Sequence, residues 1–137
     1  LEAFRRCGMT FDEPRYYHTG RYSYRFGYVG MQKVLQQTPE VTAVFAMADV
    51  IAIGAIRAAH DAGLRVPEDI SVIGYDGLTI GDYYCPRLST ISQSLDRMAQ
   101  RSFEILMACV EEGAPAKHIT VPFTLSCKQS VRNLLKE

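Results

Sequence analysis

Two short apolar segments, each followed by an acidic residue, constrain most strongly what this chain can fold into. Residues 44–47 precede Asp49, and residues 70–73 precede Gly74 and Asp76. Apolar runs without alternation are typical of parallel strands that helices cover on both faces. An open parallel sheet binds ligands just beyond the carboxyl ends of its strands. Carboxylates at two such ends therefore predict a binding crevice.

The rest of the chain continues this alternation of strands and helices. Strands that alternate with helical patterns of about ten to fifteen residues predict an α/β fold, a parallel sheet with right-handed crossovers that helices flank. The expected strands are 15–18, 43–47, 70–73, 88–92 and 119–121. The expected helices are 24–37, the stretch between Asp49 and Gly63, 94–112, and a last helix that a capping box of Ser126 and Gln129 would begin.

Composition and charge narrow the class of protein. The chain has 137 residues, which is enough for one domain with a hydrophobic core. Its 15 basic and 15 acidic side chains cancel, which argues against a non-specific nucleic-acid binder. No apolar run reaches the length of a membrane span. Leu1, Phe4 and Gly8 already share one face of a helical pattern, so we expect the sequence to be a segment of a longer protein.

Four cysteines are spread along the chain without a C-x-x-C pair or an adjacent histidine. Their spacing favours neither a disulfide framework nor a metal site. Free thiols are typical of a reducing compartment, which indicates a cytoplasmic protein. The four residues are Cys7, Cys85, Cys109 and Cys127.

Three side chains near the expected strand ends are candidates for ligand contact, and each has a simpler interpretation. The Asp76 carboxylate can accept two hydroxyl or N–H hydrogen bonds, which suits a sugar or a nucleobase edge, or it is a turn residue in Asp-Gly. The Tyr22 ring can stack on a flat ligand face or cover a loop. Asp49 favours a structural role as the N-cap of its helix.

No pattern in the sequence predicts catalysis or a bound cofactor. The chain lacks the G-x-S-x-G, G-x-G-x-x-G and phosphate-loop patterns. The histidines His18, His60 and His118 are far apart, and no carboxylate or cysteine pattern accompanies them. We therefore expect no catalytic residue, no metal site and no cofactor. Gly27 and Gly30 fall inside an expected helix, where they favour close packing against another helix.

A longer pattern includes both strand ends and points to a family. Residues 41–49 (VTAVFAMAD), followed by residues 52–55 (AIGA), resemble the a-D-x-x-A-x-G segment of the LacI/GalR family of bacterial transcription regulators. Residues 63–76 (GLRVPEDISVIGYD) resemble the hallmark of that family almost position for position, and residues 86–91 (PRLSTI) resemble its P-x-L-T-T-I strand. The resemblance extends over about residues 20–130.

The resemblance implies a periplasmic-binding-protein-like (type I) effector domain, in which two α/β lobes enclose a cleft. It assigns residues 1–92 to the C-terminal effector-binding lobe. Residues 93–122 would belong to the other, mostly absent lobe, and residues 123–137 would return to the first. Operator DNA would be bound by an N-terminal helix-turn-helix that these residues do not include. The family pattern also continues a strand to about Lys128, which conflicts with the capping box at Ser126.

The resemblance also implies roles for individual residues. Asp76 matches the acidic residue that holds sugar hydroxyls or a purine edge, and Tyr22 matches an aromatic position that packs against the ligand. Ala48 stands where sugar-responsive members often have asparagine, so one polar ligand contact is missing and a different ligand is a possible consequence. Ile53 and Tyr84 match positions through which family members form dimers.

Together these observations predict the effector-binding and dimerisation portion of a LacI-type transcription regulator. The expected partners are a small-molecule effector, either a sugar or a purine-like compound, operator DNA, and a second copy of the chain. A periplasmic sugar-binding protein of the same fold is the alternative. An enzyme that uses Asp76 as nucleophile or base is a third class, which no partner lysine, metal cluster or phosphate loop supports.

Overall fold

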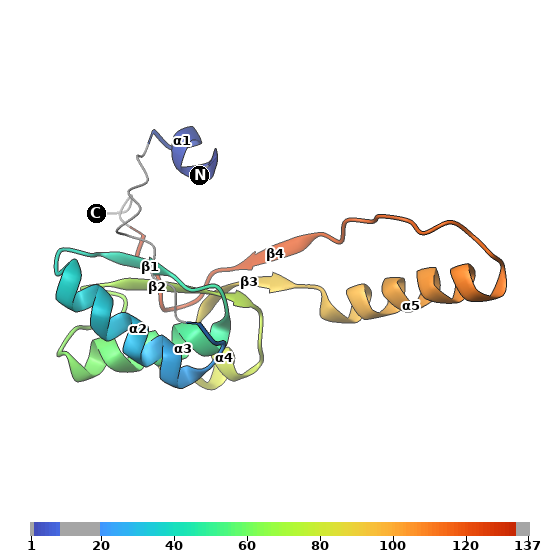
Figure 1. Cartoon of the computed structure of the whole chain (residues 1–137). Helices are drawn as coiled ribbons and strands as arrows, with labels where there is room; N and C mark the ends of the chain where they lie inside the picture. Colours follow the sequence, from blue (N-terminus) through green and yellow to red (C-terminus); the bar gives the residue numbers. More distant parts are fainter. Residues whose placement is uncertain (1, 9–19, 134–137) are drawn as a thin grey trace.

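The computed structural model describes residues 2–8 and 20–133. The helices are α1 (Glu2–Arg6), α2 (Tyr24–Gln37), α3 (Asp49–Asp61), α4 (Ile80–Tyr83) and α5 (Leu95–Glu111), and the strands are β1 (Ala43–Phe45), β2 (Ser71–Asp76), β3 (Ser89–Gln93) and β4 (Phe123–Ser126). One four-stranded sheet in the order β1-β2-β3-β4 lies at the centre, with α2 and α3 against one face and α5 extending away from it (Figure 1). The expected α/β class is confirmed. The strand expected at 15–18 lies outside the described ranges.

The sheet is mixed, not wholly parallel. β1 pairs with β2, and β2 with β3, in parallel, as expected from the alternation of strands and helices. β4 pairs with β3 in the antiparallel direction, with Thr90 opposite Ser126. The reason lies in α5, which carries the chain away from the sheet, so that the returning segment enters β4 from the opposite end (Figure 1).

Two local predictions near β4 are wrong. Residues 119–121 have no strand pairing, and the strand begins at Phe123 instead. Ser126 ends β4 and begins no helix, which agrees with the family pattern against the capping box. Its neighbours are held instead by other partners: the Lys128 amide donates to the Ser89 hydroxyl at 2.8 Å, and Gln129 donates from its backbone N–H to the Arg87 carbonyl at 3.0 Å.

The helices α2 and α3 pack closely because glycine lies at their contact. A Cβ atom on Gly27 would collide with the carbonyl oxygen of Ile51, and one on Gly54 would collide with that of Tyr24. This confirms the expectation for Gly27. The ends of α2 follow the sequence prediction: the Ser23 hydroxyl accepts from the backbone N–H of Phe26 at 3.3 Å, and the helix stops at Gln37.

The hydrophobic core lies between these two helices and one face of the sheet. Val72 of β2 is fully buried there, whereas the neighbouring strand residue Phe45, which points to the other face, is 57% exposed. The prediction that helices cover both faces of β1 therefore does not hold at Phe45. The core consists of Met31, Val34, Ala46, Ala52, Ile53, Ala55, Ile56, Ala58, Ala59, Val66, Ile70, Val72 and Leu88.

The helix α5 contributes no buried residue to this core. The apolar side chains expected on its inner face are exposed, among them Leu95 at 50% and Leu106 at 58%. Ser94 occupies the N-cap position, but its hydroxyl donates to the Pro122 carbonyl at 3.3 Å and does not cap the helix. α5 and residues 112–122 therefore form an extension beside the packed body (Figure 1).

Candidate functional site at the carboxyl edge of the sheet

The carboxyl ends of β1, β2 and β3 meet at one edge of the sheet. Asp76, the last residue of β2, lies opposite Ser92 of β3. The side-chain amide of Gln93 donates from Nε2 to the Asp76 carboxylate at 3.0 Å. Ala48 follows β1 after two intervening residues, at the same edge. The edge therefore carries a carboxylate that a neighbouring amide orients, a geometry suited to hydroxyl or N–H groups of a ligand.

Asp76 has an unusual backbone conformation. Its φ is 118°, and it is the one non-glycine residue with positive φ in the part of the chain that the structure describes. L-residues adopt this region rarely, and such strain gathers at functional sites. Burial raises the pKa of the Asp76 carboxyl above its ordinary value, and the hydrogen bond from Gln93 opposes that rise. Strain and partial burial together distinguish Asp76 from an ordinary turn aspartate.

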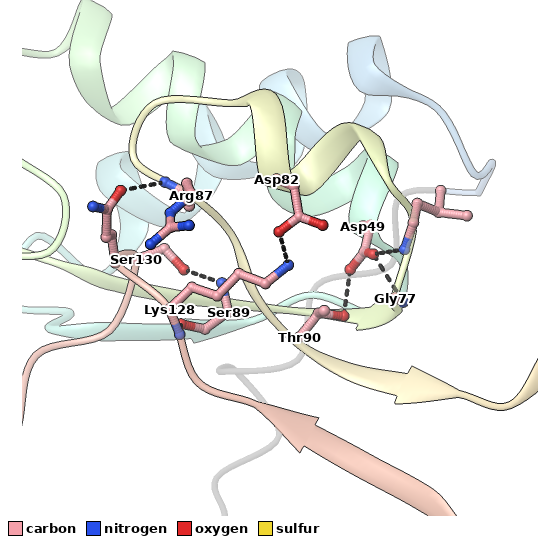
Figure 2. Close-up of polar contacts among 10 residues, drawn as sticks. Asp49, Gly77, Asp82, Arg87, Ser89, Thr90, Lys128 and Ser130 are labelled. Atoms are coloured by element: carbon pink, nitrogen blue, oxygen red, sulfur yellow. Dashed lines mark hydrogen bonds and ion pairs between the residues drawn. The ribbon is translucent and has the colours of Figure 1, made fainter.

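A second carboxylate, that of Asp49, lies beneath this edge and is completely buried. Its Oδ2 accepts from the backbone N–H groups of Gly77 at 2.9 Å and Leu78 at 2.6 Å, and its Oδ1 accepts from the Thr90 hydroxyl at 2.6 Å (Figure 2). The prediction that Asp49 caps its own helix is wrong. Ala48 occupies the N-cap position, Asp49 is the first residue of α3, and its side chain binds the loop that follows Asp76.

Glycine allows this loop to lie close to its supports. A Cβ atom on Gly74 would collide with Oδ1 of Asp49, and one on Gly77 would collide with the hydroxyl oxygen of Ser92. Gly77 also has a φ of 82°, which glycine adopts at little cost. The loop after β2 is thus packed against α3 on one side and β3 on the other.

The other two predicted ligand residues, Ala48 and Tyr22, differ in exposure. Ala48 is 3% exposed, and its backbone carbonyl accepts from the amides of Ile51 and Ala52 in the first turn of α3. Tyr22 is 69% exposed. It precedes α2, whose first turns contact α3 near Ile51. Ligand contacts of Ala48 and Tyr22 stay predictions.

The two residues predicted at a dimer interface differ in exposure. Ile53 is 6% exposed and belongs to the core, which is the inward-packing alternative for an apolar helix residue. Tyr84 is partly buried, and that burial raises the pKa of its phenol. Near it, Asp61 accepts from the Tyr28 hydroxyl at 3.1 Å and pairs with Arg57 at 3.0 Å. A two-fold contact through this region stays a prediction.

A separate polar cluster fastens the C-terminal segment to the sheet. The Ser130 hydroxyl donates to the Val72 carbonyl at 2.6 Å. It accepts from the Ser89 amide at 2.8 Å, and Lys128 pairs with Asp82 of α4 at 2.5 Å (Figure 2). Ser89 begins β3, so this cluster lies at the amino end of that strand. Its role is therefore to hold α4 and the chain after β4, not to line the carboxyl edge.

One hollow of the described chain lies away from this edge. A space of about 810 Å³ lies between α5 and residues 114–122, with Arg97, Arg101, Glu104 and Lys117 among its lining residues. No residue of α5 is buried, so this hollow belongs to the exposed extension and not to the packed body. Within residues 2–8 and 20–133, no group of three or more His, Cys, Asp or Glu side chains is arranged to hold a metal ion. No helix in these residues is long and apolar enough to span a membrane.

Sequence reasoning missed Gln93 and Thr90 as members of this edge. Both act through partners far along the chain, because Gln93 binds Asp76 and Thr90 binds Asp49. One general expectation could have found them: residues near the end of β3 lie beside residues near the end of β2 when the two strands are parallel neighbours. The pairing of Asp76 with Ser92 places Gln93 there, but the register itself is not readable from local sequence.

Comparisons with known proteins place this chain in a family. A family model described as periplasmic binding protein-like domain matches residues 1–131. The HTH-type transcriptional regulator MalR of Clostridium butyricum is 36% identical over 116 residues, which are 85% of this chain and 35% of that protein. The HTH-type transcriptional repressor PurR of Photorhabdus laumondii subsp. laumondii is 47% identical over 107 residues, 78% of this chain and 31% of that protein. The chain thus spans about a third of these relatives.

Solved structures agree with the sequence relatives. A LacI-type transcription regulator from Bifidobacterium animalis subsp. lactis superposes with a TM-score of 0.91 at 25% identity, covering 97% of this chain and 48% of that one. The regulator CelR in complex with cellobiose gives 0.85 at 28% identity, covering 94% and 39%. The lac repressor dimer bound to operator and the anti-inducer ONPF gives 0.76 at 31% identity, covering 82% and 39%. The resemblance to LacI-family regulators is confirmed.

Proposed function

This chain belongs to the periplasmic binding protein-like domain family, and we propose that it is the effector-binding and dimerisation portion of a LacI-type DNA-binding transcription regulator. One observation carries the proposal. Asp76 presents a strained, partly buried carboxylate at the end of β2, where an open sheet binds ligands. The relatives named as HTH-type regulators support this reading over a periplasmic sugar-binding protein.

The effector that we propose is a sugar or a purine-like metabolite. Asp76 would accept hydrogen bonds from its hydroxyl or N–H groups, while Gln93, which donates to Asp76, would keep the carboxylate in one orientation. The exposed Tyr22 ring would stack on a flat ligand face. Ala48, which is 3% exposed, would offer only a small apolar contact. The cellobiose complex of CelR supports a sugar.

We propose that residues 1–92 and 123–137 belong to one lobe of a two-lobed domain and that residues 93–122 belong to the other. The exposed apolar side chains of α5 support this division, since contiguous exposed apolar surface marks an interaction site. The missing part of that second lobe and a helix-turn-helix that binds operator DNA would lie in a longer protein. Such a regulator would act in the cytoplasm, and it would not be an enzyme.

The same proposal includes a homodimer formed near Tyr84 and the helix α3 that holds Ile53. The lac repressor structure was solved as a dimer, which supports a two-fold arrangement. Because Ile53 itself is buried in the core of this chain, the surface that would meet a second copy is the flank of α3 beside Tyr84, where Arg57 is exposed.

Substitution of Asp76 in the longer regulator tests the proposed effector site. Asp76→Asn keeps the shape of the side chain but removes its charge and one acceptor oxygen. Hydrogen bonds to charged groups contribute about 1.5–3 kcal/mol, so affinity should fall roughly ten- to a hundredfold. Titration calorimetry against cellobiose, ribose, lactose, adenine and guanine measures the change. Glu40→Gln, the same loss of charge in the loop before β1, is the matched control and should bind like wild type.

The outcome also decides between the two interpretations of Asp76. Asparagine is among the best replacements for an aspartate that serves only in a turn. An unchanged dissociation constant for the compound that binds wild type would therefore remove Asp76 from the site. Binding to none of the five compounds, together with no effect of any of them on retention of genomic DNA by the regulator, would overturn a sugar- or purine-sensing function.

A further inference from the structure

The buried carboxylate of Asp49 connects the three elements that meet at the candidate site. Asp49 begins α3, directly after Ala48, and it binds both the loop that follows Asp76 and the β3 residue Thr90. Each of its oxygens accepts at least one hydrogen bond, so the charge is well solvated by protein groups although the residue is 0% exposed. Burial of a carboxylate is costly without such partners. A complete set of partners indicates a defined structural task.

The partners of Asp49 show what that task is. Gly77 and Leu78 immediately follow Asp76, and their amides converge on a single oxygen of Asp49 at 2.9 and 2.6 Å. Asp76 has the φ of 118° described above. A residue in a sparsely populated conformation keeps it only when its surroundings over-determine it. The two amide hydrogen bonds and the close approach of Gly77 to Ser92 supply that constraint.

The third hydrogen bond of Asp49 extends the constraint to β3. Thr90 lies three residues before Gln93, whose amide donates to the Asp76 carboxylate. Asp49 therefore acts on the candidate carboxylate from two directions: through the backbone that follows Asp76, and through the strand that supplies the hydrogen-bond donor of Asp76. Asp49 itself is buried and cannot meet a ligand.

We propose that Asp49 is the positioning residue of the effector site: it holds the loop after β2 so that the Asp76 carboxylate keeps its strained, ligand-facing orientation. This inference rests on the proposed role of Asp76. Without Asp49, the backbone at Asp76 would relax toward extended φ values, and the carboxylate would turn away from the edge that Gln93 defines.

Two substitutions of Asp49 separate positioning from charge. In Asp49→Asn, the amide oxygen can still accept from Gly77 and Leu78, and the NH₂ group can donate to the Thr90 hydroxyl oxygen, so all three contacts are retained. Asp49→Ala removes all three. The three-bond coupling between the amide proton and Hα of Asp76 reports its φ, and can be measured by NMR on the 137-residue chain without any ligand. This coupling constant is small at the Asp76 φ of 118° and large for extended backbone.

The expected result is that the Asp76 coupling is small in wild type and Asp49→Asn but large in Asp49→Ala. Affinity is measured in the longer regulator, for whichever of cellobiose, ribose, lactose, adenine and guanine binds wild type. It should fall about tenfold or more in Asp49→Ala and less than about threefold in Asp49→Asn. A purely structural role would lower the melting temperature of Asp49→Ala and leave the coupling and the affinity unchanged, which would overturn the inference.

A further variant keeps the test decisive if Asp49→Ala does not fold. Thr90→Val removes one of the three hydrogen bonds and nearly preserves side-chain volume, and it should reduce affinity by about threefold to tenfold. Wild-type affinity in Thr90→Val, in a protein whose binding Asp76→Asn impairs, would refute positioning by Asp49 while leaving the proposed site intact. If Asp76→Asn binds like wild type, the proposed site itself fails, whatever the Asp49 variants do.

Discussion

At the residue scale, Asp76 combines features that oppose folding. Its φ of 118° is unfavourable for an L-residue, and burial raises the pKa of its carboxyl. Neither feature strengthens the hydrophobic core, to which Asp76 does not belong. Residues whose conformation or burial lowers the stability of the fold are typical of functional sites. A carboxylate kept partly buried and strained at a strand end supports the proposed ligand contact of Asp76.

Replacement of Asp76 by asparagine should therefore raise the melting temperature at neutral pH. The pKa of Asp76 is raised in the folded chain, so the folded chain binds the proton more tightly than the unfolded one. Protonation favours folding: its full contribution is present below the ordinary pKa of 3.8 and is lost as the pH rises through the higher folded-state pKa. Asparagine carries no charge and tolerates positive φ.

Thermal unfolding followed by circular dichroism measures this effect. The difference in melting temperature between Asp76→Asn and wild type should shrink as the pH falls below 3.8. Glu40→Gln, at an exposed position, is the matched control. A lower melting temperature of Asp76→Asn at neutral pH would contradict the prediction.

At the scale of elements, the contact between α2 and α3 shapes the end of the molecule where the site lies. The two helices meet through Gly27 and Gly54, and a backbone carbonyl occupies the space of each missing side chain. That approach holds the first turns of α2 against the first turns of α3, which follows Ala48. A change in helix spacing would therefore be felt at the candidate site as well as in the core.

Gly27→Ala should destabilise the chain, although helix propensity alone predicts the opposite. Alanine is favoured over glycine inside a helix by about 1 kcal/mol. Here the added methyl group would collide with the carbonyl oxygen of Ile51, and overpacking of this kind costs typically about 1–3 kcal/mol. Urea unfolding should show a lower midpoint for Gly27→Ala. Lys33→Ala, an exposed change on the same helix, should stay within about 0.5 kcal/mol of wild type. A stabilised Gly27→Ala would refute the close contact.

The helix α5 should be the least protected long element of the isolated chain. It has no buried residue, and its apolar side chains Leu95, Phe103 and Leu106 are all at least half exposed. Amides in elements with few buried contacts open at low free energy. Hydrogen exchange by NMR should therefore show the α5 amides exchanging faster than those of β2, whose Val72 is fully buried. Equal protection in a monomeric sample would contradict the prediction and the proposed division into lobes.

At the scale of the whole molecule, one packed body and one extension account for the arrangement. The body contains the sheet, the core and the candidate site, whereas α5 and the segment that returns from it project beyond the sheet (Figure 1). The proposed second lobe would cover the exposed apolar side chains of the extension. On this view, the chain alone offers one wall of an effector cleft.

The proposed dimer makes a prediction at this scale. An isologous contact places the same patch of both subunits together. Tyr84→Ala in the longer regulator should shift sedimentation from dimer toward monomer while the circular dichroism spectrum is retained. Tyr24→Ala, which removes an exposed tyrosine from the first turn of α2, serves as the control and should stay dimeric. An unchanged dimer in Tyr84→Ala would place the interface elsewhere.

The variant Ile53→Glu tests the other residue predicted at the dimer interface. The side chain is 6% exposed within the core, so glutamate there would bury a charge without a partner. We therefore expect loss of folding from this variant. A folded monomer would instead mean that Ile53 can turn outward and form the contact that the family resemblance implies.

The amino-acid sequence by itself determined the order of the longer elements from α2 to α5 and the location of the candidate edge. The helix predicted at 24–37 begins and ends at those residues, and Gly63, with φ of 80°, follows α3 as expected. These features depend on neighbours a few residues apart: hydrophobic periodicity, a capping hydroxyl, proline and glycine. Asp76 at a strand end was predictable for the same reason, because an apolar run followed by Gly74 and a polar residue is local information.

Tertiary structure decided which side chains act together. Asp49 binds amides 28 and 29 residues away and a hydroxyl 41 residues away, so its local pattern predicted a helix cap instead. The antiparallel direction of β4 and the burial of Ile53 likewise depend on how distant segments pack. Hydrogen bonds between segments are set by strand register and helix spacing, which only the assembled core establishes. For that reason, Asp76 is visible in the sequence, whereas Asp49, Thr90 and Gln93 become its supports only in the fold.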